Sequence, residues 1–320
     1  MTATRESQLA SAVLMIRPVR FESNPHTAGS NRFQGRNPDS PEQQQKAAER
    51  EFAGLRRALE SAGVDVFEFD DTEEPHTPDA IFPNNWVSFH ADGTVVLYPM
   101  MAPNRRTERR PDIIESLAED HGFQVRDIVD LSGHEADGRF LEGTGSLVLD
   151  RVNRIAYACL SPRTHLDVLG DFAQRMDYDV VAFDALDRNG TPIYHTNVLM
   201  NVGEELAVIC TEAIPDDEQR QAVRSRLEST GHRVVDISFD QMDAFAGNML
   251  ELRSAAGKRI IAMSEQARRS LDAGQLAAIE ATANIVSAPI DRIESSAGGS
   301  VRCMLAEIHL QRDTDGERAR

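Results

Sequence analysis

The sequence has few cysteines and no long apolar run. Its 320 residues include only Cys159, Cys210 and Cys303, without a C-x-x-C pair, so neither a disulfide framework nor a thiolate zinc site is predicted. No segment approaches the ~20 apolar residues that span a bilayer. The apolar run from Ala12 to Ile16 is too short for a signal peptide. We therefore expect a reduced, cytoplasmic protein without a membrane anchor.

Basic residues are also scarce relative to acidic ones, 34 against 52, which gives a formal net charge of −18. This charge repels nucleic-acid phosphates and anionic membrane surfaces, so both are disfavoured as partners. Only Lys46 and Lys258 are lysines, which leaves little material for Schiff-base chemistry. Hydrophobic residues make up 41% of the chain, enough for a globular core. Small molecules are the expected partners, and the sequence leaves homo-oligomerisation open.

The clearest positive feature is a repeat. The turn glycines Gly93 and Gly203 are 110 residues apart, which corresponds to two repeat units. Gly203 and Gly257 are 54 residues apart, which corresponds to one unit. Each of these glycines lies in a polar turn of the kind that joins two strands of a hairpin. Five such strand-turn-strand segments are predicted, at residues 84–100, 143–161, 195–213, 247–265 and 298–310.

Helical patterns alternate with the hairpins. Pro41, Pro162 and Pro215 are predicted to occupy the first position of three of the helices, where proline is favoured. A short apolar strand follows each helix. The predicted helices cover 41–62, 107–121, 162–176, 215–230 and 264–282, and the strands 64–69, 125–129, 179–183, 233–237 and 284–288.

Repeats of this length must stack on one another to bury their apolar faces. The strand Ala12 to Arg17, helix 41–62 and the last hairpin would form one unit split between the two ends of the chain, which closes a ring. We therefore predict a single α/β domain over residues 1–320. A doubly wound sheet is disfavoured because no G-x-G-x-x-G follows a strand, and Gly143-x-Gly145 is predicted to open a strand rather than a helix.

A ring would bring the starts of the hairpins together near its axis, and the unusual polar residues lie at those starts. Separately, Cys303 is explained as apolar strand filler, His195 as a strand-end residue and Glu142 as part of a solvated turn. Together, a nucleophile, a base and a carboxylate at equivalent repeat positions are what a central active site requires. Cys159 and Cys210 lie in the middle of apolar strands and are predicted to be core residues.

These stretches resemble the guanidino-group-modifying enzymes of the pentein fold. The chain is most similar to the type described as citrulline utilisation hydrolase or arginine-deiminase-related amidinotransferase. The resemblance implies a five-bladed α/β propeller of pseudo-fivefold ββαβ repeats, and it assigns the nucleophile to Cys303, the general acid and base to His195 and an orienting carboxylate to Glu142. The matching stretches include MIRPVRFESNPHTAGSNRFQ (15–34), EPHTPDAIFPNNW (74–86), FLEGTGSLVLDR (140–151), YACLSPRT (157–164), YHTNVLMNVGEELAVIC (194–210), FAGNMLEL (245–252) and GGSVRCMLAEI (299–308).

The sequence departs from this family at two substrate-binding positions. Where many members carry an acidic residue, this chain has Asn85 and Asn197. A buried guanidinium would lack charged partners there, whereas a neutral ureido group can both donate to and accept from amides. We therefore expect an L-citrulline-like substrate, which hydrolysis through S-carbamoyl-Cys303 would convert to ornithine, ammonia and carbon dioxide.

Further substrate contacts are predicted from the same segments. Arg105 or Arg106 would bind the substrate carboxylate, since a guanidinium fork matches a carboxylate. Asp79 would bind the amino group or another substrate nitrogen, and Phe82 would line the site. The loop from Ser23 to Ser40 is either a mobile flap over the site or an ordered surface loop.

Three other functions stay open on the sequence alone. An arginine deiminase or dimethylarginine-type hydrolase, or an amidinotransferase, would use the same residues. A non-catalytic ligand-binding module would keep the fold without the chemistry. A metalloenzyme is disfavoured because the nine histidines form no H-x-x-x-H or H-E-x-x-H pair. We therefore predict neither a metal nor a cofactor.

Overall fold

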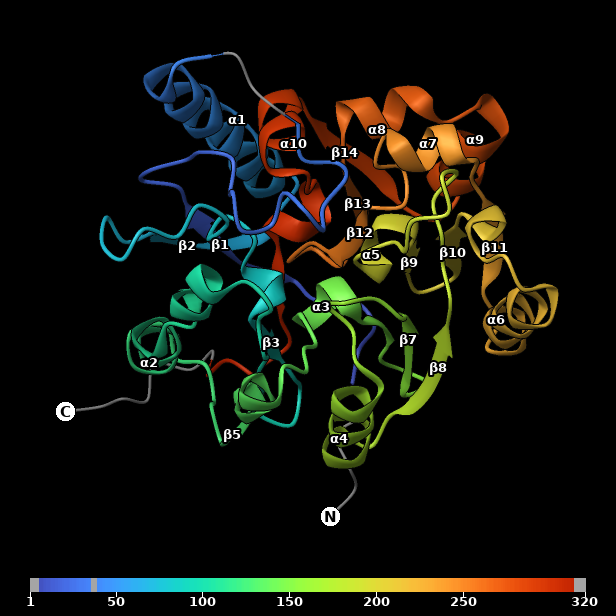
Figure 1. Cartoon of the computed structure of the whole chain (residues 1–320), viewed down its shortest axis with the longest axis horizontal. Helices are drawn as coiled ribbons and strands as arrows, with labels where there is room; N and C mark the ends of the chain where they lie inside the picture. Colours follow the sequence, from blue (N-terminus) through green and yellow to red (C-terminus); the bar gives the residue numbers. More distant parts are fainter. Residues whose placement is uncertain (1–5, 36–38, 314–320) are drawn as a thin grey trace.

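Three-stranded sheets are arranged around a central axis in the computed structural model, which describes residues 6–35 and 39–313 (Figure 1). Five such sheets lie within these residues, and each joins an antiparallel strand pair to a third, parallel strand. The structure is therefore the predicted five-bladed α/β propeller. Four of the sheets are continuous in sequence: β3 (Val87–Phe89), β4 (Thr94–Leu97) and β5 (Asp127–Asp130); β6 (Val148–Asp150), β7 (Ile155–Cys159) and β8 (Asp179–Phe183); β9 (Met200–Val202), β10 (Leu206–Ile209) and β11 (Arg233–Asp236); and β12 (Leu250–Arg253), β13 (Arg259–Ser264) and β14 (Asn284–Ala288).

The fifth sheet closes the ring between the two ends of the chain. Strand β1 (Ala12–Arg17) pairs in parallel with β2 (Asp65–Asp70) and antiparallel with β15 (Ala306–Ile308). This confirms the prediction of a unit split across the termini. The prediction of a complete hairpin at 298–310 is wrong, because β1 already supplies the antiparallel partner of β15. Residues Val301–Met304 form a 3-10 turn instead.

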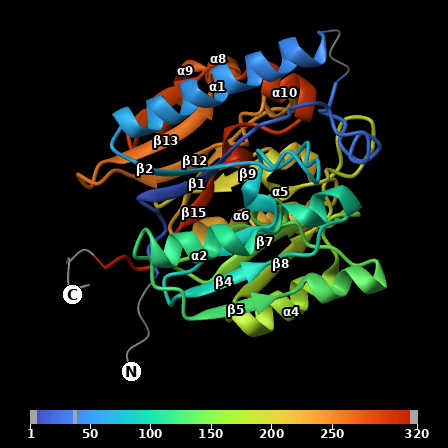
Figure 2. The ribbon, with the colours of Figure 1, turned by 90° about the vertical axis from the view of Figure 1, so that its left-hand side faces the viewer.

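Helices cover the outer side of the sheets (Figure 2). Helix α1 packs on β2 and β14, and it joins the split sheet to its neighbour. Among the described residues, no helix is both long and apolar enough to cross a membrane. The helices of two or more turns are α1 (Pro41–Ser61), α2 (Pro111–Glu119), α4 (Leu166–Met176), α6 (Asp217–Ser229) and α9 (Ala273–Glu280). Shorter helices are α7 (Phe239–Asp243), α8 (Glu265–Ser270) and α10 (Asp291–Ala297).

Side-chain caps, rather than prolines, define where two of these helices begin. The side chains of His165 and Asp216 accept hydrogen bonds from the first-turn amides of α4 and α6. Helix α4 therefore starts four residues after Pro162, and α6 starts two residues after Pro215. The predicted helix 264–282 is divided into α8 and α9, because Asp272 forms a new capping box at the start of α9.

Short helical turns, rather than strands, lead into the inner strands at the axis. They are the 3-10 turn Pro83–Asn85, α3 (Gly143–Ser146), α5 (Thr196–Leu199) and the 3-10 turn Val301–Met304. The expectation that Gly143 opens a strand is therefore wrong. A single turn of helix reverses the chain within four residues, which keeps both the turn and the following strand close to the axis.

Gly143 has the least free space of these turn residues, and this generates a prediction. It has a φ of 48°, and a Cβ atom there would lie 2.2 Å from the backbone oxygen of Asn84. We expect Gly143→Ala to lower the free energy of unfolding by roughly 3 kcal/mol, measured by urea denaturation. Gly170→Ala is the control, because Gly170 lies exposed in α4 with open space around it. Equal denaturation midpoints for the two variants would contradict this account.

Candidate active site

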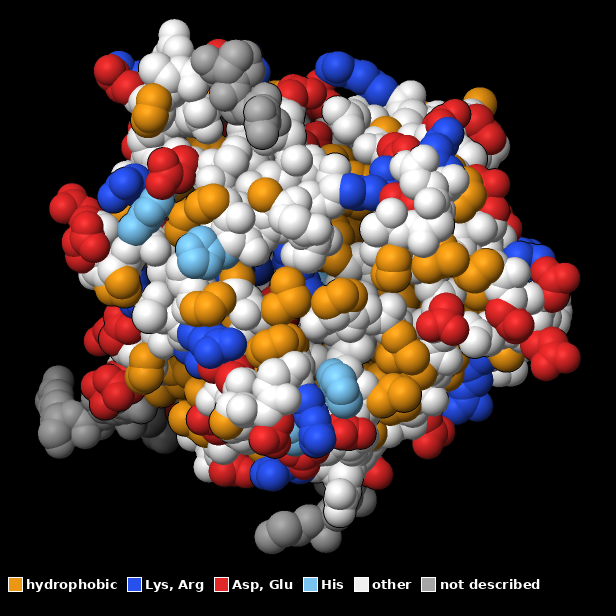
Figure 3. All heavy atoms as spheres, in the orientation of Figure 1, with side chains coloured by type: hydrophobic (Ala, Val, Ile, Leu, Met, Phe, Trp, Pro, Cys, Tyr) orange, Lys and Arg blue, Asp and Glu red, His pale blue; other side chains and the backbone are white. Residues whose placement is uncertain are grey.

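The turns at the axis bring the three predicted catalytic residues into one buried site. Glu142 immediately precedes α3, His195 precedes α5, and Cys303 lies in the last 3-10 turn. All three residues are buried: Glu142 is 1% exposed, His195 is 2% exposed and Cys303 is 3% exposed. In the space-filling view, basic side-chain atoms are visible deep in the hollow at the centre of this face (Figure 3). The cavity is lined by Asn31, Asp79, Phe82, Asn85, Arg105, Arg163, Tyr194, His195, Ala297, Gly298, Gly299 and Cys303.

Glu142 and His195 form a direct hydrogen bond between two modules of the ring. The distance from His195 Nε2 to Glu142 Oε2 is 2.8 Å. Burial would raise the pKa of Glu142, but Arg163 and the hydrogen bond from His195 hold this pKa well below its ordinary value. A carboxylate can only accept hydrogen bonds, so Nε2 of the imidazole carries the hydrogen. Nδ1 is thus the ring position that can take up a proton.

The imidazole of His195 is neutral at physiological pH. Burial lowers its pKa to about 4, although the hydrogen bond with Glu142 acts in the opposite direction. Gly145 packs against the ring, since a Cβ atom there would lie 2.7 Å from Nδ1. A neutral imidazole with an unprotonated Nδ1 at a buried cavity can accept a proton from a group bound there.

Two amide groups face the sulfur of Cys303. Its Sγ atom lies 3.4 Å from Asn197 Nδ2 and 3.3 Å from Asn248 Nδ2, and both amides donate toward it. Donors placed on the sulfur stabilise a thiolate relative to a thiol. Asn197 was a predicted site residue, whereas Asn248 was not. Its signals in the sequence were its position after Gly247, at the start of the fourth predicted hairpin, and its place in the matching stretch FAGNMLEL.

Asp79 lies under the loop that precedes α1. Its Oδ2 atom accepts hydrogen bonds from Asn24 Nδ2 at 2.8 Å and from Thr27 Oγ1 at 3.2 Å. The same loop contributes Asn31, whose amide donates to the Ala297 carbonyl at 3.1 Å. The predicted loop therefore reaches the site through Asn24, Thr27 and Asn31, of which Asn31 lines the cavity. Residues 36–38 lie outside the described residues.

Arg105 and Arg163 enter the site, whereas Arg106 does not. Arg105 is buried; it pairs with Glu108 at 2.8 Å and donates to Asn85 Oδ1 at 2.9 Å. Arg106 points away, because its Nε atom donates to the Met100 carbonyl and lies 3.3 Å from a carboxylate oxygen of Glu135.

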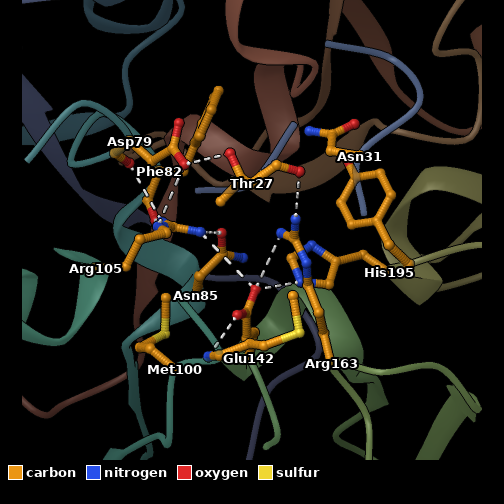
Figure 4. A network of polar contacts seen from close by, with 12 residues as sticks. Thr27, Asn31, Asp79, Phe82, Asn85, Met100, Arg105, Glu142, Arg163 and His195 are labelled. Atoms are coloured by element: carbon orange, nitrogen blue, oxygen red, sulfur yellow. Dashed lines mark hydrogen bonds and ion pairs between the residues drawn. The ribbon is translucent and has the colours of Figure 1, made fainter. Parts of the chain in front are cut away.

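Arg163 links the Glu142 carboxylate to the loop that precedes α1. Its Nη1 atom is 3.3 Å from Glu142 Oε2, and its Nη2 atom lies 3.5 Å from the carbonyl oxygen of Thr27 (Figure 4). Nη2 also donates to Ser30 Oγ at 2.6 Å. The guanidinium also lies over the Tyr194 ring, 4.8 Å from its centroid. Sequence reasoning missed Arg163, although it lies in the stretch YACLSPRT that supports the family resemblance.

Several buried polar atoms around the cavity have no hydrogen-bond partner within the described structure. A buried polar atom left unpaired costs roughly 1–3 kcal/mol, so such atoms are uncommon outside binding sites. Their grouping here fits a planar ligand that carries both donors and acceptors. They are Asp79 Oδ1, Asn85 Nδ2, Asn197 Oδ1, Asn248 Oδ1 and Arg163 Nε. Across the described chain, no group of three or more His, Cys, Asp or Glu side chains is arranged to hold a metal ion.

Comparisons with known proteins agree with the ring and its site. Residues 17–310 match the family model described as N,N dimethylarginine dimethylhydrolase, eukaryotic. ArgZ is described as an arginine dihydrolase of the ornithine-ammonia cycle in cyanobacteria. Its product-bound N-terminal domain superimposes with a TM-score of 0.71 at 18% identity, over 93% of this chain and 97% of that domain. A search of curated proteins gives no match.

Two further solved structures share the fold. Full-length ArgZ superimposes with a TM-score of 0.68 at 18% identity, over 92% of this chain but only 40% of its own length. The second is a mutant of the enzyme DDAH from Pseudomonas aeruginosa in complex with citrulline. It superimposes with a TM-score of 0.65 at 14% identity, over 94% of this chain and all of that one.

The ring of five modules, with cysteine, histidine and glutamate at its axis, defines a member of the pentein superfamily of guanidino-group-modifying enzymes. Within that superfamily, the chain belongs to the N,N-dimethylarginine dimethylhydrolase family, whose model covers nearly its whole length.

The neutral state of His195 predicts how stability depends on pH. Unfolding restores its ordinary pKa of 6.5, while the folded protein holds the imidazole neutral down to about 4. The unfolded chain therefore binds one more proton in this window, and the free energy of unfolding rises with pH from about 4 to 6.5. In His195→Gln this rise should be smaller by roughly 3 kcal/mol, measured by urea denaturation across the window. The exposed His26→Gln serves as the control. An identical slope in His195→Gln and the unsubstituted protein would refute the assignment.

Proposed function

We propose that the protein is a cysteine-dependent hydrolase of the guanidino group of an arginine-like amino acid. The observation that carries this proposal is the convergence of Cys303 and His195 in one buried cavity, with Glu142 hydrogen-bonded to His195 and unpaired amide and carboxylate atoms nearby. The family is named for the hydrolysis of a dimethylated arginine, and ArgZ is described as an arginine dihydrolase. Both facts favour a guanidino substrate.

Cys303 acts as the nucleophile in this proposal. The thiolate, held by the amides of Asn197 and Asn248, attacks the central carbon of the guanidino group and forms a carbon–sulfur bond. His195, which has taken up the thiol proton of Cys303 at Nδ1, transfers this proton to the departing nitrogen as the carbon–nitrogen bond breaks, and ammonia or an amine leaves. The neutral imidazole then takes a proton from water, which attacks the same carbon. Breaking the carbon–sulfur bond releases a ureido product and restores the thiolate.

Glu142 supplies the negative charge that Asn85 and Asn197 lack. Its carboxyl group is ionised and is hydrogen-bonded to His195. A buried guanidinium needs such a charge partner to offset the loss of its hydration. Glu142, rather than the asparagines, would hold the positive charge of an arginine-like substrate. This favours a cationic substrate more than the sequence alone suggested.

Citrulline is the second candidate substrate. The unpaired atoms of Asn85, Asn197 and Asn248 include one donor and two acceptors, which match the oxygen and nitrogens of a neutral ureido group. The chemistry would be the same up to the leaving group: Cys303 would keep a carbamoyl group, and ornithine would leave. Water would then release carbamate, which breaks down to ammonia and carbon dioxide.

The far end of either substrate carries a carboxylate and an amino group. Arg105 is engaged by Glu108 and Asn85, whereas Nε of Arg163 is buried without a partner. We therefore assign the substrate carboxylate to Arg163, with Arg105 beside it, and the amino group to Asp79. Arg106 has no part in this assignment, because it lies outside the cavity.

A direct assay distinguishes the substrates. Purified protein is incubated separately with arginine, dimethylarginine and citrulline, and citrulline, ornithine, ammonia and dimethylamine are quantified. We expect citrulline from arginine or from dimethylarginine, and Cys303→Ser should lower turnover by at least about a thousandfold because the nucleophile is lost. Cys210→Ser, at a buried cysteine outside the site, is the matched control. Undiminished activity in Cys303→Ser would rule out the covalent mechanism.

Other outcomes of this assay replace the proposal with an alternative. Ornithine and ammonia from citrulline, with arginine untouched, would establish the ureido substrate. Transfer of an amidino group to an added amine would indicate an amidinotransferase. Binding without turnover of any of the three compounds would indicate a non-catalytic module.

The asparagine at position 85 provides a second prediction. In Asn85→Asp, a new carboxylate faces the substrate and adds a charge partner for a guanidinium but not for a ureido group. We expect the ratio of kcat/KM for arginine to that for citrulline to rise by about tenfold. Asn104→Asp, in the part-buried turn outside the cavity lining, is the control. A ratio that falls in Asn85→Asp would show that residue 85 does not contact the reacting group.

A further inference from the structure

Glu294, in the middle of α10, is a buried carboxyl group that the proposed reaction does not use. The residue is 2% exposed. Its side-chain Oε1 atom accepts a hydrogen bond from Ser300 Oγ at 2.6 Å. Its backbone oxygen accepts a hydrogen bond from the amide of Gly298 at 2.9 Å. One residue therefore holds both ends of the segment from Gly298 to Ser300.

This segment leads directly to Cys303. The carbonyl of Ser300 accepts the hydrogen bond of the Cys303 amide at 3.0 Å, which begins the turn that carries the sulfur. Ser300 itself is fully buried. A shift of Ser300 would thus be transmitted through one backbone hydrogen bond to Cys303.

The middle of the segment is enclosed by other site residues. Tyr194 Oη donates to the Gly298 carbonyl at 2.6 Å. A Cβ atom on Gly299 would lie 2.7 Å from the ring of Phe82, so the backbone and the ring are in tight contact. Tyr194 and Phe82 thus contact the segment from the cavity side, and Glu294 holds it from α10.

The surroundings of Glu294 do not compensate for a negative charge. Within residues 6–35 and 39–313, no arginine, lysine or histidine lies at ion-pair distance from its carboxyl group. The neighbouring titratable groups are Asp291 on the same helix and Glu51 on α1, both acidic, and Ser264 at the end of β13 contributes a neutral hydroxyl. Burial raises the pKa of Glu294 to about 7. The group therefore changes its charge near neutral pH.

We propose that Glu294 is a positioning residue that fixes the turn bearing Cys303 through its hydrogen bond with Ser300. The proposal rests on the role of Cys303 as the nucleophile in the proposed function. The neutral carboxyl group of Glu294 holds Ser300 without adding charge to the site. The ionised form still accepts the hydrogen bond, but it places an uncompensated negative charge in the buried packing of the turn that bears Cys303 and so loosens this turn.

A double-mutant cycle tests the hydrogen bond. Glu294→Ala and Ser300→Ala each remove one partner, and each should lower kcat on the order of tenfold with KM nearly unchanged, since the nucleophile rather than substrate binding is displaced. The double variant should lose no more than either single variant, because both act through one contact. Multiplicative losses, or unchanged kcat in Ser300→Ala, would overturn the proposal.

The pH profile separates positioning from a merely structural role. Glu294→Gln keeps an acceptor for Ser300 but cannot ionise, so its kcat should equal that of the unsubstituted enzyme at pH 6 and exceed it increasingly above pH 7. Glu251→Gln is the matched control. Glu251 lies on β12 and is also a buried glutamate with a raised pKa, and its carboxyl group accepts a hydrogen bond from the Glu204 amide. Parallel pH profiles for Glu294→Gln and the unsubstituted enzyme would contradict the proposal.

A readout without turnover separates this proposal from the proposed function. The rate at which iodoacetamide alkylates Cys303 is followed by peptide mass spectrometry in the same variants. It should fall in Glu294→Ala and Ser300→Ala, and its pH dependence should change in Glu294→Gln, even if none of the tested compounds is a substrate. An alkylation rate that is the same in all variants would refute the positioning role whatever the enzyme acts on.

Discussion

The hydrogen bond between Glu142 and His195 is the interaction on which the site depends, because it joins two modules of the ring at the axis. A buried carboxylate is stable only when charges and donors surround it. Here Arg163, the Met101 amide and His195 meet that need, and Arg163 extends the network to the loop that precedes α1. The same contact selects the tautomer of the imidazole. Loss of this contact would therefore alter the base, the loop and the packing between modules together.

The fold places the site by geometry that each module repeats. A single helical turn at the axis sends the chain into the inner strand, and His195, just before α5, and Cys303, within the last turn, line the central cavity. The turns approach one another so closely that only glycine fits at positions 143 and 299. The reacting groups consequently come from segments that are distant in sequence, and closure of the ring between β1 and β15 is required to assemble them.

Much of this arrangement could be predicted from the sequence, because the turn glycines and the alternation of apolar strands and helices repeat along the chain. The short turns could not, since four residues are too few to show a helical period. The choice between Arg105 and Arg106 could not either: the two are adjacent, and only the packing shows that one guanidinium turns inward and the other outward. Arg163 and Asn248 lie in stretches that resemble the family, but only the packing around the axis shows that their side chains reach the site.

The central claim is that Cys303 forms a covalent bond to the carbon of the substrate. Rapid acid quenching during turnover of arginine, dimethylarginine or citrulline, followed by peptide mass spectrometry, tests it most directly. The account predicts a mass increase on the peptide that contains Cys303, equal to the retained amidino-amino-acid or carbamoyl group, and none on the peptides of Cys159 and Cys210. Steady turnover with no adduct on Cys303, together with undiminished turnover after Cys303 is blocked, would contradict it.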